Sequence, residues 1–425
     1  MQPIKIIIRG NYFDCQIYRG RLYLWTFNGD LKVYDWEQLI YSFIEKGIDS
    51  TILKYGFLFG SRLYHSLVRD LLKDQDLTTV LYNKFNNVVG LLLELSEDEI
   101  EAFLIGEQDV PNKTLPSDTE IYNNKLYYIT QKGFFANEVH NSKTKNPVST
   151  KQNKLWDASL FSIRANKYPQ IALSGGSEGL FEYNMLNGAL PAYESKKIEK
   201  IPIFQVSKNH SSFANYSYLS IYNTSLVESS YMSTFGWVNL QNKEGDIIQD
   251  ERGKPIYKRE FIQNISELEI FNSKGRDFNK KYISWGIGDK IYKATEDGFK
   301  VVKFNNYANI EKGESEFKTL KSVKLAPWKG DVVYGGTTYF GNIIECENAL
   351  VVIQSDNESF TIPNEITRWR TYPRSINYGN HLHVILDDRL EIYSFNHDYF
   401  VSQNTKNIGI EFEPKDSQIE NITTD

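Results

Sequence analysis

The feature that most constrains this 425-residue chain is a local pattern that recurs along its length. Each copy has a short apolar or alternating run, a polar turn with Gly, Asn or Asp, and a second such run, which is typical of a β-hairpin. In the first copy, Asn28-Gly29 offers the positive φ values that a tight hairpin turn needs. Clear copies occupy residues 21–36, 170–184, 290–304 and 383–395. Aromatic residues make up 14% of the chain, which also favours strands.

The spacing of the turns indicates how the hairpins are organised. The turns at Gly298 and Asp388 are 90 residues apart, or two units of about 45, the period of four-stranded propeller blades. We therefore predict an all-β fold, a closed β-propeller of about seven four-stranded blades, in residues 1–36 and 111–402. The N-terminal strand, Lys5 to Arg9, is expected to pair with strands near the C-terminus and so remove exposed sheet edges.

In hairpin pattern and period, the chain resembles the WD-repeat type of β-propeller over most of residues 3–402 outside an insertion. The resemblance concerns architecture. The sequence has no Gly-His dipeptide, and its sole Trp-Asp, Trp156-Asp157, precedes a predicted strand instead of ending one. The resemblance therefore implies degenerate blades, and kelch-like or other propellers stay open as alternatives.

Residues 37–110 break the strand pattern and are predicted to form a helical insertion after the first blade. Ser96 to Glu99 has the sequence of a capping box. The segment 61–72 places apolar residues on one helical face. This face is a candidate partner-docking helix, and the alternative is a local cap on the propeller. Its residues are Leu63, Tyr64, Leu67, Val68 and Leu71.

Charge and cysteine content exclude several protein classes. The net charge of -6 gives no overall attraction to nucleic acid or acidic lipid, so such a partner would need a local patch. Cys15 and Cys346 are too few for a disulfide framework. Neither a signal peptide nor a membrane-spanning apolar run occurs, so we expect a cytoplasmic protein without membrane contact. Residues 403–425 are predicted to be a mobile acidic tail.

No residue pattern indicates catalysis. His381 and His383 share one face of a predicted strand near acidic residues, but no spacing fixes a third metal ligand. The Gly-rich segments 175–179 and 286–288 lack the lysine and the following helix of a phosphate loop. We therefore predict no catalytic residue, no metal and no cofactor.

One local concentration of positive charge stands out near the C-terminus. Three arginines alternate with aromatic residues between positions 368 and 374, a composition that can grip phosphate, bases or an acidic peptide. The alternative is a strand with a core Trp and with arginines that are solvated or paired to carboxylates. The candidate residues are Arg368, Trp369, Arg370, Tyr372 and Arg374.

Blade repeats, a large insertion and no catalytic pattern favour one function. The leading hypothesis is a non-catalytic protein-interaction scaffold, or a regulatory subunit of a larger complex, whose partner is another protein. One alternative is an anion or nucleic-acid reader that uses the arginine segment. The other is an enzyme whose site lies in the propeller channel and draws residues from several blades.

Overall fold

The computed structural model of the chain describes most of its length. The described residues are 1–110, 114–140, 147–151, 153–165, 170–185, 203–217, 220–224, 230–249, 252–271, 282–296, 298–305, 315–323, 328–354 and 358–400. The predicted tail, residues 403–425, lies outside them.

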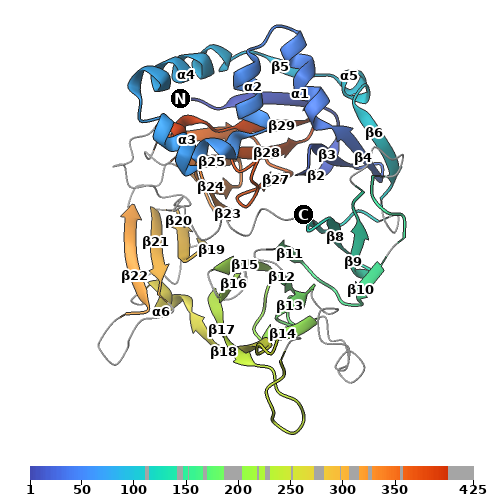
Figure 1. The fold of residues 1–425 in the computed structure, drawn as a ribbon, viewed down its shortest axis with the longest axis vertical. Coiled ribbons are helices and arrows are strands. Elements are labelled where there is room, and N and C mark those ends of the chain that lie inside the picture. Colours follow the sequence, from blue (N-terminus) through green and yellow to red (C-terminus); the bar gives the residue numbers. More distant parts are fainter. Residues whose placement is uncertain are drawn as a thin grey trace. The chain divides into compact units, whose positions relative to one another are not determined.

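Seven sheets, six of four strands and one of five, form the blades of a β-propeller fold (Figure 1). This confirms the predicted fold class and the blade number. The chain divides into two compact units, which we describe separately. Unit 1 comprises Met1–Leu115, His140–Pro147 and Pro327–Asp425, and unit 2 comprises Pro116–Val139 and Val148–Ala326.

Unit 1 contains three blades and the helical segment. Its first strands are β1 (Ile4–Arg9), β2 (Tyr12–Tyr18), β3 (Arg21–Thr26), β4 (Asp30–Asp35), β5 (Leu93–Leu95) and β6 (Leu104–Asp109). Its helices are α1 (Trp36–Glu45), α2 (Ser50–Phe57), η1 (Gly60–Tyr64), α3 (Ser66–Leu71), α4 (Gln75–Val88), α5 (Glu97–Glu101) and η4 (His397–Tyr399). Its remaining strands are β23 (Val332–Thr338), β24 (Gly341–Cys346), β25 (Ala349–Gln354), β26 (Ser359–Pro363), β27 (Arg368–Thr371), β28 (His381–Leu386) and β29 (Arg389–Ser394).

Unit 2 contains the other four blades. Their strands are β7 (Asp118–Tyr122), β8 (Lys125–Thr130), β9 (Gly133–Glu138), β10 (Asn153–Trp156), β11 (Ser162–Ala165), β12 (Gln170–Ser174), β13 (Leu180–Asn184), β14 (Ile203–Ser207), β15 (Phe213–Ser217) and β16 (Ser220–Thr224). They continue with β17 (Tyr231–Asn239), β18 (Tyr257–Ser266), β19 (Tyr282–Ile287), β20 (Lys290–Thr295), β21 (Gly298–Phe304) and β22 (Phe317–Val323), and the short helix α6 (Glu267–Phe271) follows β18. Buried apolar side chains, such as Ile171 and Leu173 of β12, form its core.

All four predicted hairpins are confirmed. They are the antiparallel pairs β3–β4, β12–β13, β20–β21 and β28–β29. The first turn differs in detail from a two-residue primed turn. Gly29 alone has positive φ, at 91°, and its N–H donates to the Thr26 carbonyl oxygen. A longer hairpin loop with glycine at its left-handed position explains this geometry.

The N-terminal strand completes the C-terminal blade, as predicted. β1 is antiparallel to β29, with Ile4 opposite Ser394 and Arg9 opposite Arg389. Its other edge is covered by β5, which runs parallel to it. This blade therefore has five strands in the order β27-β28-β29-β1-β5.

The helical segment lies inside a blade, which differs from its predicted place after the first blade. The chain leaves the sheet at the end of β4, forms α1 to α5, and returns as β6, which is antiparallel to β4. The predicted range 37–110 thus includes two strands, β5 and β6. β5 has only three residues, and both strands pair with residues distant in sequence, so local periodicity did not reveal them.

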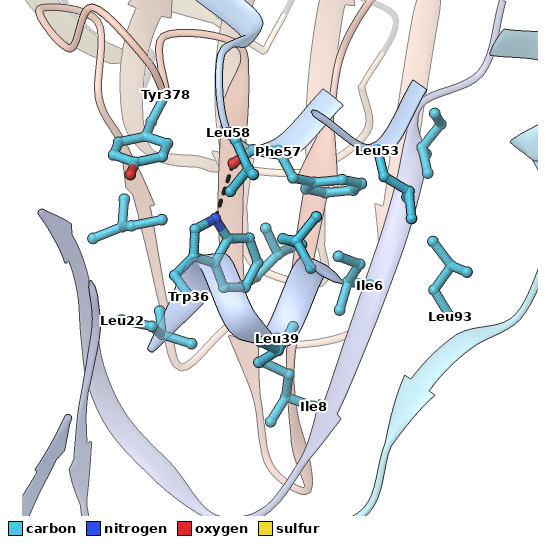
Figure 2. Close-up of a cluster of buried hydrophobic side chains, with 14 of the residues drawn as sticks. Ile6, Ile8, Leu22, Trp36, Leu39, Leu53, Phe57, Leu58, Leu93 and Tyr378 are labelled. Atoms are coloured by element: carbon cyan, nitrogen blue, oxygen red, sulfur yellow. Dashed lines mark hydrogen bonds between the residues drawn. The ribbon is translucent and has the colours of Figure 1, made fainter. Parts of the chain in front are cut away.

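The first helices of this segment pack on the sheet that contains β1 (Figure 2). Trp36, Leu53 and Phe57 are fully buried, together with Ile6 and Ile8 of β1. The indole Nε1 of Trp36 donates to the Phe57 carbonyl oxygen at 2.9 Å (Figure 2). These helices are therefore part of the core of unit 1.

Buried hydrogen bonds fix α2 to the C-terminal blade. The Gly56 carbonyl oxygen accepts from Asn380 Nδ2 at 2.8 Å, from Ser394 Oγ at 2.8 Å and from His381 at 3.1 Å. The Tyr399 hydroxyl donates to the Gly60 carbonyl oxygen at 2.9 Å. Buried bonds of this kind supply directional contacts beyond apolar packing.

The segment 61–72 is not one helix. The 3-10 turn η1 ends at Tyr64, and His65 adopts an extended conformation, with ψ of 138°, before α3 begins. The single amphipathic face expected from the sequence is therefore divided at His65. Among the described residues, no helix has both the length and the apolar character to cross a membrane.

Candidate functional site

The arginine segment of β27 is anchored by a buried carboxylate that the sequence analysis missed. Asp14 of β2 is fully buried and accepts two hydrogen bonds from Arg370, from Nε at 2.9 Å and from Nη2 at 2.7 Å. Arg368 Nη1 donates to the same carboxylate at 3.2 Å, and the Cys15 N–H donates at 2.8 Å. The sequence could have indicated this ion pair, because Asp14 lies in a strand of mostly apolar and aromatic residues and a buried carboxylate needs a partner.

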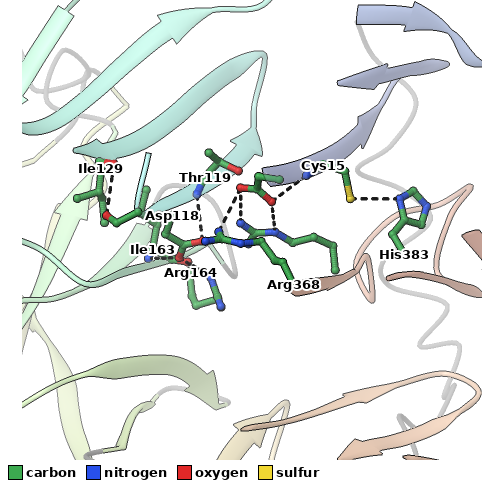
Figure 3. Close-up of polar contacts among 11 residues, drawn as sticks. Cys15, Asp118, Thr119, Ile129, Ile163, Arg164, Arg368 and His383 are labelled. Carbon is green, nitrogen blue, oxygen red and sulfur yellow. Dashed lines mark hydrogen bonds and ion pairs between the residues drawn. The ribbon is translucent and has the colours of Figure 1, made fainter. Parts of the chain in front are cut away.

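Unit 2 contains a related arrangement. Asp118 of β7 is buried and accepts from Arg164 Nη1 and from the Ile163 N–H of β11, both at 2.8 Å (Figure 3). In both units, a buried aspartate on one blade thus holds an arginine on the first strand of another. The recurrence indicates that these ion pairs join blades within each unit.

The rest of the arginine segment divides between the two sides of β27. The Trp369 indole Nε1 donates to Glu345 Oε2 at 2.7 Å, and burial raises the pKa of that carboxyl group. Tyr372 follows the strand and contacts His383, with ring centroids 5.0 Å apart. Arg374 is exposed in the next loop. The five predicted residues thus form no single shared surface, and the two arginines of β27 are paired to Asp14.

The two predicted histidines of β28 form a buried hydrogen-bonded chain. Since the Gly56 carbonyl oxygen can only accept, we assign the proton of His381 to Nε2. His381 Nδ1 then accepts from His383 Nε2, at 3.4 Å. His383 Nδ1 is left to accept from the Tyr372 hydroxyl at 3.4 Å or the Cys15 thiol at 3.8 Å. Every member of this chain is thereby accommodated in its neutral form.

The pKa values of these hydrogen-bonded residues favour a structural role over a catalytic one. Burial lowers the pKa of His381 to about 3 and the pKa of His383 well below its ordinary value. Burial also raises the pKa of the Cys15 thiol far above neutrality, so it is a poor nucleophile. Among the described residues, no three His, Cys, Asp or Glu side chains are placed to hold a metal ion.

The buried imidazoles predict a pH dependence of stability. Their pKa values are lowered in the folded state, so between about pH 6.5 and pH 4.5 the unfolded chain binds protons that the folded chain does not. The free energy of unfolding should therefore fall as pH falls, with a slope approaching about 1.4 kcal/mol per pH unit for each imidazole. Denaturant unfolding across this range measures it.

The control for this prediction is His65, whose side chain is exposed. His383→Gln should flatten the dependence, whereas His65→Gln should leave it unchanged. Equal slopes in His383→Gln and the unmodified protein would contradict the proposed source of the pH dependence.

The predicted docking helix does not form one exposed face. Leu63 and Tyr64 are buried in the core of unit 1, with 4% and 1% of their surface exposed, and Val68 is partly buried against it. The side chain of Leu67 lies outside those that the structure describes. Leu71 is 61% exposed. The cap interpretation therefore fits Leu63 and Tyr64, and of the four side chains that the structure describes, Leu71 is the one left largely exposed.

Other exposed apolar side chains lie on α4 and beside its two ends, and Figure 1 shows α4 at the margin of unit 1. Leu77 and Val80, 46% and 55% exposed, are neighbours on α4 because they are three residues apart. Leu71 precedes the helix, and Leu91 and Leu92, 44% and 76% exposed, follow it. We call these five residues the α4 surface. Large apolar side chains concentrated in one exposed segment mark interaction sites more often than scattered ones do.

Comparison with known proteins supports no assignment to a family. No protein-family model matches the chain, and no curated protein matches it. Solved structures with a similar fold include Hsv2 of Kluyveromyces lactis, with 14% identity, a TM-score of 0.41, and coverage of 71% of this chain and 84% of that one. Human WBSCR16 has 8% identity and a TM-score of 0.39, with coverage of 72% and 84%. At these values the likeness identifies no function.

Proposed function

We propose that this chain is a non-catalytic protein-interaction protein, acting as a scaffold or regulatory subunit, and that it binds its partner through the α4 surface. The observation that carries the proposal is the set of large apolar side chains left exposed on and beside α4. Burying such side chains against a partner is favourable by about 25 cal/mol for each Å² of apolar area.

The packing of α4 supports this use. Phe85 and Val88 are buried on the side that faces the core, and the Tyr82 ring lies 5.3 Å from that of Phe400. One side of the helix is thus anchored, so Leu77 and Val80 are presented on an ordered element. A partner would not have to order this helix on binding, which reduces the entropic cost of association.

The buried groups give the enzyme alternative no support. The histidines of β28 and Cys15 are held in neutral forms, and the two arginines of β27 are engaged by Asp14. We therefore carry neither the channel enzyme nor the anion reader further. The two cysteines are both free and buried, which suits the cytoplasm as the compartment of this binding role.

The test is affinity purification of the tagged full chain from its native host, with quantitative mass spectrometry. A protein recovered in stoichiometric amount with the unmodified chain should be lost with the double variant Leu77→Ser/Val80→Ser. Deletion of residues 37–110 is unsuitable, because this range supplies core residues such as Phe57.

The matched control is Phe261→Ser/Ile262→Ser in β18 of unit 2, whose side chains are 41% and 61% exposed. This variant removes similar apolar area elsewhere and should retain the partner. Recovery of no stoichiometric protein, or equal recovery with both double variants, would overturn the proposal.

A further inference from the structure

We propose that residues 408–412 of this chain add to the outer edge of β5 as an antiparallel strand and cover Leu91 and Leu92. The occupant of this end of the α4 surface is thus a segment of the same chain, and Leu77 and Val80 are left to the partner. Only this division of the α4 surface rests on the proposed function, because the added strand does not depend on a partner.

The outer edge of β5 is open to a further strand. Among the described residues, β5 is the last strand of its sheet and pairs only with β1 on its other side. In five other blades, the fourth strand pairs with a register shift, and such irregularities protect an edge from further pairing. The remaining fourth strand, β26, ends at Pro363, which has no N–H. The β1–β5 pair has neither feature.

Five consecutive residues at this edge can line an added strand. Leu93 and Leu95 of β5 are buried in the core of unit 1, where Figure 2 shows Leu93. Glu94 lies between them and so faces the other side of the sheet. Leu91 and Leu92 directly precede β5 and are 44% and 76% exposed. A strand beside all five would bury apolar surface that β5 alone leaves open.

The sequence after Phe400 contains a segment that suits this edge. Residues 408–412 read Ile-Gly-Ile-Glu-Phe and lie outside the part of the chain that the structure describes. Their alternation is that of a half-buried strand, with three apolar side chains on one face. These are Ile408, Ile410 and Phe412. Placed beside β5, this face would continue the apolar face of Leu93 and Leu95.

Phe400 brings the chain to the right end of α4. Its ring lies 5.9 Å from that of Phe85, in the last turn of the helix. Leu93 is eight residues after Phe85, and Ile408 is eight residues after Phe400. Eight extended residues span about 26 Å. Two stretches of equal length that begin side by side can therefore meet.

Charge favours the antiparallel direction. Ile410, at the centre of the segment, can lie beside Leu93. In the antiparallel direction, Gly409 then lies beside Glu94. In the parallel direction Glu411 lies there instead, and like charges directly opposite each other destabilise a sheet.

The experiment measures amide hydrogen exchange of the full chain by mass spectrometry. Amides paired to an edge strand exchange only when the strand opens. Relative to the intrinsic rates of the two sequences, we expect residues 406–414 to exchange at least about tenfold more slowly than residues 415–425.

Two double variants of the α4 surface locate the contact. Leu91→Ser/Leu92→Ser should remove the slow exchange of the segment, because both apolar side chains at the edge are lost. Leu77→Ser/Val80→Ser is the matched control and should retain it. Exchange at Ile6–Ile8 of β1, measured in the same samples, reports that the sheet itself stays intact.

Two further variants test the segment from its own side. Ile410→Ser/Phe412→Ser should restore fast exchange, because it removes two of the three apolar side chains on the proposed face. Ile419→Ser/Ile422→Ser, later in the chain, removes similar apolar area and should leave the slow exchange unchanged.

Three results would overturn the inference. Residues 406–414 that exchange as fast as residues 415–425 would show that no strand is added. Slow exchange that survives Leu91→Ser/Leu92→Ser would place the segment elsewhere, and its loss in Leu77→Ser/Val80→Ser would place it over α4. None of these results decides whether a partner binds the chain, which the affinity purification tests separately.

Discussion

Replacement of Asp14 by alanine is expected to lower the free energy of unfolding by about 3–5 kcal/mol. Asp14 is fully buried and holds Arg370, whose side chain is only 9% exposed, through two hydrogen bonds. Without the carboxylate, the buried Arg370 guanidinium would lose the acceptor of these two hydrogen bonds. Denaturant unfolding of the variant measures the loss.

Asp388 provides a matched control, because it also pairs with two arginines, Arg9 at 2.9 Å and Arg389 at 2.7 Å. Its side chain is 57% exposed, so solvent screens both pairs, and Asp388→Ala should cost no more than about 1 kcal/mol. Similar losses in Asp14→Ala and Asp388→Ala would contradict the assignment of Asp14 as the anchor of β27.

Phe57→Ala is expected to lower the free energy of unfolding by about 3–5 kcal/mol, because it would leave a cavity in the core of unit 1. Phe57 ends α2 and is fully buried, and its ring lies 6.2 Å from that of Trp36. A large loss would show that the helical segment stabilises the blades. The shift in the denaturation midpoint measures it.

The control for Phe57 is Phe27, which lies in the turn between β3 and β4 and is 47% exposed. Its ring contacts that of Phe13 at 5.4 Å, so Phe27→Ala should cost about 1 kcal/mol at most. If Phe57→Ala cost as little as Phe27→Ala, the helical segment would be a loosely attached addition to the blades.

The sequence predicted the blades well because hairpins are local. The two strands of each predicted hairpin lie close in sequence, so alternation and turn residues such as Gly29 identify both together. Pairing of β1 with β29 was predicted from the need of a propeller to cover its sheet edges. The helix capped by Ser96 and Glu99 was also recognisable, because a capping box is a local signal.

Features that depend on distant residues were not predictable in this way. The return of the chain as β6 to pair with β4 depends on contacts across the helices between them. Asp14 and Arg370 are 356 residues apart, so their spacing in the sequence could not predict that they pair. An acidic residue within an apolar strand did indicate that Asp14 would need a partner. The break at His65 overrode the helical periodicity of residues 61–72.

The candidate docking residues also show that a local sequence pattern does not predict burial. Helical periodicity grouped Leu63, Tyr64 and Leu71 on one face, but periodicity does not reveal whether an apolar face is covered. Burial placed Leu63 and Tyr64 in the core and left Leu71 exposed beside Leu77 and Val80. The docking surface proposed from the structure therefore shares only Leu71 with the one proposed from the sequence.

The most direct measurement is the recovery of the partner by the full chain in its native host, compared between Leu77→Ser/Val80→Ser and Phe261→Ser/Ile262→Ser. The proposed binding role predicts a stoichiometric protein that the first variant loses and the second retains. Equal recovery by the two variants, or a chain that is recovered alone, would contradict it.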